Sequence, residues 1–182
     1  KTFELGSKVS DKPSDIVLLL DRSGSMASLG LNPPQPLSDA KEAAISFINQ
    51  LGSKDRIAMV SFASKAREPM DLTLTSDLNS AKQLVELIGI EASSTQYTNI
   101  YEALHSAWQE LISARAQDKS SKIIILLTDG VANNPGNPQG KTEADDIKYA
   151  EDLAIKESLD AKKDGLIIYT IGLGNKINEL FL

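Results

Sequence analysis

The sequence contains no cysteine and only one histidine, His105, among its 182 residues. The absence of cysteine excludes disulfide bonds, zinc–thiolate sites and thiol catalysis. A Ser-His-Asp triad or a histidine-rich metal centre would have to depend on His105 alone. No apolar run approaches the roughly 20 residues that a membrane-spanning helix needs, so this segment is not expected to insert into a membrane.

Basic charge is also scarce, with 19 Lys and Arg residues against 25 Asp and Glu residues and a net charge of −6. The longest basic run is the pair Lys162-Lys163. Nucleic-acid-binding domains usually carry a basic patch or stripe, so nucleic acid is not expected to be the main partner. The proportions of apolar (41%) and charged (24%) residues are typical of one soluble globular domain.

The hydrophobic pattern predicts strands that alternate with helices. The continuous apolar runs at 15–21 and 122–128 are typical of strands buried on both faces, as in parallel sheets. Further strands are expected at 56–63 and 166–171. The segment 66–74 contains Pro69, which cannot donate to a ladder, and we expect it to form an antiparallel strand at a sheet edge.

Four segments have helical spacing or capping signals. Ser38 is the expected N-cap of a helix that ends before Gly52, and Ser76 or Asp77 caps a helix that runs to about Ile88. Apolar residues from Ile100 to Ile112, including Trp108, recur at helical spacing and predict a helix with a buried face. Thr142, with Asp145 at the third helical position, resembles a capping box. These elements predict an α/β fold, in which a doubly wound, mostly parallel sheet has one antiparallel edge strand and helices on both faces.

Polar side chains follow the two buried strands at the points where those strands end. Asp21, Ser23 and Ser25 follow the first strand, and Asp129 follows the strand 122–128. The polar loop 93–99, which contains Thr98, precedes the helix near Ile100. Ligands of such sheets bind beyond the carboxyl ends of the strands. Hydroxyl and carboxylate oxygens suit Mg²⁺ first, and then Mn²⁺ or Ca²⁺.

The mixture of hydroxyls and carboxylates has a chemical consequence. If Ser23, Ser25 and Thr98 contact the metal directly, the immediate ligands are neutral, and Asp21 and Asp129 can act directly or through bound water. A metal ion with neutral ligands keeps more of its positive charge. It can then take a carboxylate from a partner as its last ligand.

These motifs resemble the von Willebrand factor type A domain family. The segment DIVLLLDRSGSM is similar to the start of that domain, and Asp21-x-Ser23-x-Ser25 matches its metal-ion-dependent adhesion site. Thr98 in YTNIYEAL and Asp129 in LLTDG match the two further elements of that site. The resemblance covers about residues 14–175 and implies a Rossmann-like fold with Asp21, Ser23, Ser25, Thr98 and Asp129 as the metal site.

Two departures from the family pattern lead to further expectations. Gln96-Tyr97 precedes Thr98 where the family often has glycine, which predicts a bulkier loop. The family usually continues with a short strand and a C-terminal helix, whereas this sequence ends at Leu182. We therefore expect residues 14–182 to be a domain truncated at its C-terminal end. Residues 1–13, which are polar and precede the first apolar run, are expected to be a lead-in or linker. Residues 180–182 would begin the missing helix, and the strand 166–171 would be incompletely covered.

The resemblance implies a metal-dependent protein-binding or adhesion module whose partner supplies a Glu or Asp carboxylate, rather than an enzyme. The sequence looks most like bacterial cell-surface and pilus-associated members of the family. That resemblance implies an extracellular or surface location and leaves a cytoplasmic one open. One alternative is a structural subunit of such an assembly with a vestigial metal site. A hydrolase is a weaker alternative, because phosphoaspartyl phosphatases have a second carboxylate where this chain has Ser23.

Other polar residues have more ordinary interpretations. His105 lies off the apolar stripe and is expected to face solvent rather than to catalyse a reaction. Asp145 and Asp146 are expected to stabilise a helix N-terminus rather than to bind a second ion. The loop 131–140 is either a passive connection or part of a partner-binding rim.

Overall fold

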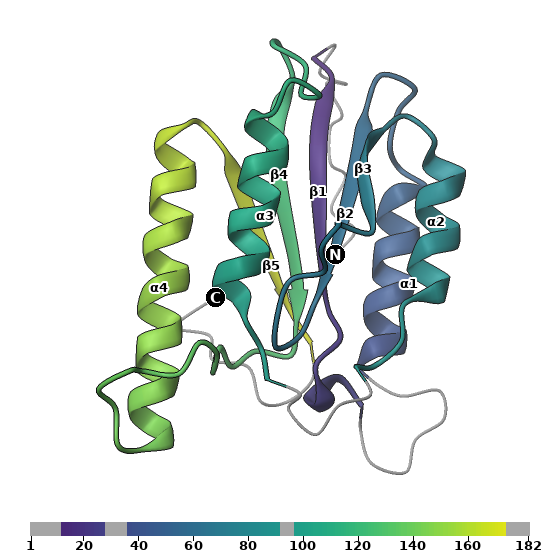
Figure 1. Ribbon diagram of the computed structural model, residues 1–182. Helices are drawn as coiled ribbons and strands as arrows, with labels where there is room; N and C mark the ends of the chain where they lie inside the picture. The colour runs from purple at the N-terminus through teal and green to yellow at the C-terminus, as the bar shows by residue number, and fades with distance from the viewer. Residues whose placement is uncertain (1–11, 28–35, 92–96, 174–182) are drawn as a thin grey trace, which may run out of the picture.

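The computed structural model describes residues 12–27, 36–91 and 97–173. Within this part of the chain, one sheet has the strand order β3-β2-β1-β4-β5, and helices cover both of its faces (Figure 1). The strands are β1 (Ser14–Asp21), β2 (Arg56–Phe62), β3 (Leu72–Thr75), β4 (Ser121–Thr128) and β5 (Ile167–Gly172).

The helices divide the hydrophobic core into two layers. Helices α1 and α2 pack on one face of the sheet, and α3 and α4 pack on the other. Their bounds are α1 Leu37–Ile48, α2 Leu78–Leu87, α3 Ile100–Ile112 and α4 Glu143–Lys163, and a short 3₁₀ turn, η1, spans Gly24–Met26. None of the described helices is long and apolar enough to span a membrane.

Strand β1 is the central strand, which explains its unbroken apolar sequence. It pairs in parallel with β2 and with β4, so that Leu18 lies between Met59 and Ile125. Alternate side chains enter the two core layers: Val17 and Leu19 face α3, while Leu18 and Leu20 face α1. The predicted α/β architecture, with its mostly parallel sheet, is confirmed.

Within the described residues, the edge strands β3 and β5 each have one side that pairs with no other strand. Strand β3 is antiparallel to β2, as predicted, but it begins at Leu72 rather than near Ala66. Before that point, the carboxylate of Asp71 accepts a hydrogen bond from the Ser61 N–H and so takes the place of a backbone ladder bond. At the other edge, Ile167, Tyr169 and Ile171 of β5 are 41–56% exposed.

Two of the three expected helix caps are present. The Asp77 side chain accepts hydrogen bonds from two backbone N–H groups at the start of α2, and Thr142 with Asp145 forms a complete capping box on α4. The predicted Ser38 cap is wrong, because α1 begins at Leu37, with Pro36 rather than Ser38 as its N-cap. Pro36 also bridges to Ala27, which fixes the entry of the chain and leaves Ser38 inside the first turn.

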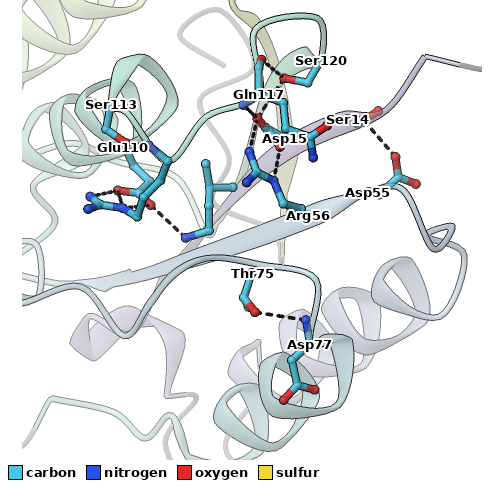
Figure 2. A network of polar contacts seen from close by, with 12 residues as sticks. Ser14, Asp15, Asp55, Arg56, Thr75, Asp77, Glu110, Ser113, Gln117 and Ser120 are labelled. Carbon is cyan, nitrogen blue, oxygen red and sulfur yellow. Dashed lines mark hydrogen bonds and ion pairs between the residues drawn. The ribbon is translucent and has the colours of Figure 1, made fainter.

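A buried carboxylate joins three segments at the amino end of the sheet (Figure 2). Asp15 accepts two hydrogen bonds from the Arg56 guanidinium, at 2.8 and 2.9 Å, and others from the Gln117 N–H and the Ser120 hydroxyl. Burial alone would raise the pKa of Asp15, but these donors more than offset it and hold the pKa below its usual value. This network fixes β1 against β2 and β4 at the end opposite the predicted metal site.

Candidate metal centre

The predicted site residues begin where the neighbouring strands β1 and β4 end. The Thr128 hydroxyl donates to Asp21 Oδ2 at 2.6 Å, and the Gly130 N–H donates to the same hydroxyl oxygen at 3.2 Å. Gly130 has a φ of 125°, a conformation that residues with a side chain rarely adopt. The end of β4 therefore turns sharply beside the Asp21 carboxylate.

The loop after β1 places the Ser23 and Ser25 hydroxyls in a row of contacts that ends at Asp129. The Ser23 N–H donates to Asp21 Oδ1 at 2.8 Å, which curls the loop back over the strand end. The hydroxyl oxygens of Ser23 and Ser25 lie 3.1 Å apart, and the Ser25 hydroxyl donates to Asp129 Oδ1 at 2.8 Å. Asp21 and Ser23 are fully buried whereas Ser25 is exposed, so this cluster meets solvent on the Ser25 side.

Thr98 is held at the same end of the sheet by the loop that follows Asp129. Its N–H donates to Asn133 Oδ1 at 2.8 Å, and its carbonyl accepts from the Asn133 and Asn134 N–H groups at 3.2 and 3.3 Å. The next residue, Asn99, caps α3 through a bond from the Glu102 N–H. Asn133 is a positioning residue that the sequence analysis did not identify. The asparagine-rich start of the loop 131–140 was its only signal in the sequence.

The electrostatics of the cluster fit a cation. Burial, with a smaller contribution from the nearby Asp129, raises the pKa of Asp21 to about 6, although hydrogen bonds from Thr128 and Ser23 act in the opposite direction. Burying this carboxylate near a second one is unfavourable unless positive charge is supplied. No cluster of three or more His, Cys, Asp or Glu side chains that could hold a metal occurs in the described segments. An ion bound here would therefore need hydroxyl oxygens, and Ser23 and Ser25 offer them at the cluster.

Several other polar residues have structural partners. Asp145 accepts hydrogen bonds from the N–H groups of Lys141 and Thr142, in agreement with the capping interpretation. Asp146 lies in the first turn of α4 and accepts a hydrogen bond from the Asn137 N–H in the preceding loop.

The two aromatic side chains of α3 that were singled out both make contacts beyond those expected. The His105 side chain is half exposed, as expected, and its Nδ1 lies 2.7 Å from Glu157 Oε1 on α4. Trp108 packs against the core as expected, although it is only partly buried, and its Nε1 donates to Asp164. The predicted loop residues 93–96 and the C-terminal residues 174–182 lie outside the described residues.

Comparison with known proteins gives a family match over most of the chain. A model of the von Willebrand factor type A domain matches residues 15–182. Bovine complement C2 is 30% identical over 96% of this chain, and bovine calcium-activated chloride channel regulator 1 is 31% identical over 95%. The chain spans only 24% and 16% of those two proteins, respectively.

Solved structures share the fold. BatB from Bacteroides thetaiotaomicron has a TM-score of 0.65 and 26% identity, with 87% of this chain and 66% of that one covered. Proximal thread matrix protein 1 from the mussel byssus, solved with a zinc-occupied MIDAS motif, has a TM-score of 0.71 and 22% identity over 94% of this chain and 38% of its own. The vWF domain of the pilus tip protein Mfa5 from Porphyromonas gingivalis has a TM-score of 0.65 and 16% identity, with 88% and 81% covered.

Proposed function

The chain belongs to the von Willebrand factor type A domain family, and on that premise we propose that it is a metal-dependent protein-binding module. The observation that carries this proposal is the contact chain from Ser23 through Ser25 to Asp129 beside the buried Asp21. Four of the five residues that match the family's adhesion motif meet there, although Asp21 and Asp129 are 108 positions apart in the sequence. The module would bind a partner through a divalent cation at this cluster.

The proposed roles follow from the chemistry of each group. The hydroxyls of Ser23, Ser25 and Thr98 would contact Mg²⁺, with Mn²⁺ or Ca²⁺ as alternatives, while Asp21 and Asp129 would balance its charge directly or through water. When bound, the ion supplies a Lewis-acidic position that an acidic partner residue can fill. The exposed Ser25 lies on the side of the cluster from which a Glu or Asp of the partner would approach.

The proposal is a binding role rather than a catalytic one. His105 contacts Glu157, not the site serines, so no imidazole is available to activate Ser23 or Ser25 in the described structure. The similarity to BatB and to a pilus tip domain supports a place in a longer bacterial protein at the cell surface.

Metal binding is tested by calorimetry and thermal melting with Mg²⁺ and with Mn²⁺. At about 100 times the dissociation constant, the ion should add about 2.7 kcal/mol of stability. For a domain of this size, that corresponds to a rise in Tm of about 5–10 °C. Ser25→Ala and Asp129→Asn should abolish the response, whereas Ser53→Ala, an exposed serine at the amino end of β2, should keep it. No heat and no melting shift in the parent protein would contradict the proposal and leave the structural-subunit alternative.

The carboxylate requirement is tested with two capped peptides that differ only in one residue, Glu or Gln. We expect the Glu peptide to bind in Mg²⁺ and to be released by a chelator. Equal binding of both peptides, or binding that persists in the chelator, would show that recognition does not involve the ion.

A further inference from the structure

A small cavity of about 210 Å³ lies between the end of β2, the segment before β3 and the last turn of α2. Its polar lining consists of Arg22, Ser61, Arg67 and Asp71, and its apolar wall comes from Leu84, Leu87 and Ile88. None of the five proposed metal-site residues lines it. Although Arg22 lies between Asp21 and Ser23 in the sequence, its side chain belongs to this cavity.

Two buried polar atoms of the cavity lack a hydrogen-bond partner in the described structure: Ser61 Oγ and Arg22 Nε. Ser61 is only 1% exposed. Buried polar side-chain atoms are nearly always hydrogen-bonded, and one without a partner is destabilising. An arginine Nε–H can only donate, and a serine hydroxyl can also donate. The group that would satisfy both is therefore a hydrogen-bond acceptor.

The charges nearby favour an acceptor that is negative. Among the described residues, the cavity lining contains two guanidinium groups but only one carboxylate, that of Asp71. Asp71 is already engaged, because it accepts from the Ser61 N–H and lies 3.4 Å from Arg67 Nε. Glu91, outside this lining, lies with its Oε1 3.7 Å from Arg22 Nη2. The Nε of Arg22 still has no hydrogen-bond partner in the described structure.

From this arrangement we propose that the cavity binds a carboxylate carried on a short aliphatic stem. One carboxylate oxygen accepts from the Ser61 hydroxyl and the other from Arg22 Nε–H, while the stem packs against Leu84 and Ile88. The side chain of Arg67 is 59% exposed and Leu87 is 79% exposed, so these two groups can move to admit the ligand. The same chemistry is offered by a glutamate side chain of a partner protein and by a free short-chain carboxylic acid.

The test uses protein stripped of divalent ions on a chelating resin, so that a carboxylate cannot bind through the proposed metal site. Propionate is titrated while the backbone amide signals are followed by NMR. For a ligand of about five non-hydrogen atoms, we expect saturable binding with a dissociation constant on the order of 1 mM. The shifted signals should include those of Ser61, Leu84 and Gly89. Propionamide, which lacks the charge, should bind at least about tenfold more weakly.

Two variants and a matched control connect this binding to the cavity. Ser61→Ala should weaken propionate binding by about tenfold, because it removes a hydrogen-bond donor to the carboxylate. Arg67→Gln should also weaken it, because it removes one of the two positive charges of the lining. Ser38→Ala should leave it unchanged, because Ser38 is another buried hydroxyl without a partner but does not line this cavity. Thermal melting of each variant verifies that it is folded.

The outcomes separate the alternatives. Tighter binding of a capped peptide with one Glu than of propionate would support a protein source for the carboxylate, and the reverse order would support a free acid. Absence of saturable shifts, equal binding of propionamide, or full binding by Ser61→Ala would overturn the proposal. Because no metal is present, none of these results depends on whether the metal-binding proposal is correct.

Discussion

Replacing Asp21 with asparagine should stabilise the metal-free protein while removing its response to metal. The pKa of Asp21 in the folded protein is about 6, against an ordinary value of 3.8. This difference means that the ionised carboxylate costs on the order of 3 kcal/mol of folding free energy. Asparagine carries no charge to bury and can still accept a hydrogen bond from the Ser23 N–H. It cannot, however, accept bonds on both sides as the carboxylate does.

After the loss of one hydrogen bond is subtracted, Asp21→Asn should raise the free energy of unfolding of the metal-free protein by about 1–2 kcal/mol at pH 7.5. The sign follows from the direction of the pKa change. A raised carboxyl pKa makes the folded state bind the proton more tightly, so the metal-free parent loses stability as the pH rises from about 4 to about 6.

The assay is urea unfolding of parent and variant at pH 4.5 and pH 7.5, each with and without Mg²⁺. The advantage of the variant should be present at pH 7.5 and nearly absent at pH 4.5, where the parent carboxyl is protonated. Asp77→Asn is the comparison variant, because Asp77 is exposed and its pKa is lowered, so its substitution should not be stabilising. A metal-free Asp21→Asn protein that is less stable than the parent at pH 7.5 would refute the reasoning.

Three further predictions concern the site and its scaffold. Mg²⁺ affinity should fall about tenfold for each pH unit below 6, because protons compete for Asp21; calorimetry that finds the same affinity at pH 5 and pH 7 would contradict this. Arg56→Met should cost about 3 kcal/mol in urea unfolding at pH 7, because it leaves Asp15 buried without its cationic partner. That cost should shrink below pH 4, and an unchanged midpoint at pH 7 would count against the role of this pair. Thr142→Ala should lower stability by about 1 kcal/mol through loss of the α4 cap, whereas Thr75→Ala on the edge strand should have a smaller effect.

The positions of Asp21 and Asp129 in the candidate site were predictable because they depend on strand ends. A buried apolar run in a parallel sheet fixes where its carboxyl end lies, and Asp21 and Asp129 follow two such runs directly. The capping box at Thr142 was predictable for a similar reason, since its two members are three residues apart. Local patterns of this kind need no knowledge of the rest of the fold.

The contacts between distant segments could not be predicted in the same way. The Asp15 network joins residues 41 and 102–105 positions apart, and no local pattern links Asp15 to Arg56 or to Gln117. The hydrogen bond from the Thr98 N–H to Asn133 likewise depends on the fold, which brings the loop after β4 next to the start of α3. Helical spacing assigned Ile112 to the buried face, but it is 44% exposed, because spacing gives a direction and not the neighbours found there.

The central position of β1 has a consequence for the order of events during synthesis. Asp21 and its partner Thr128 are 107 residues apart, so at about 5–20 residues per second the two strand ends are made roughly 5–20 seconds apart. Until β4 emerges from the ribosome, one side of β1 has no strand to pair with, and its apolar residues have an incomplete core. Parallel pairing across such a distance also folds slowly. During that interval the nascent chain carries an exposed, aggregation-prone segment and cannot yet complete the cluster that contains Asp129. If the cluster binds a cation as proposed, that ion would stabilise the domain only after β4 has been added to the sheet.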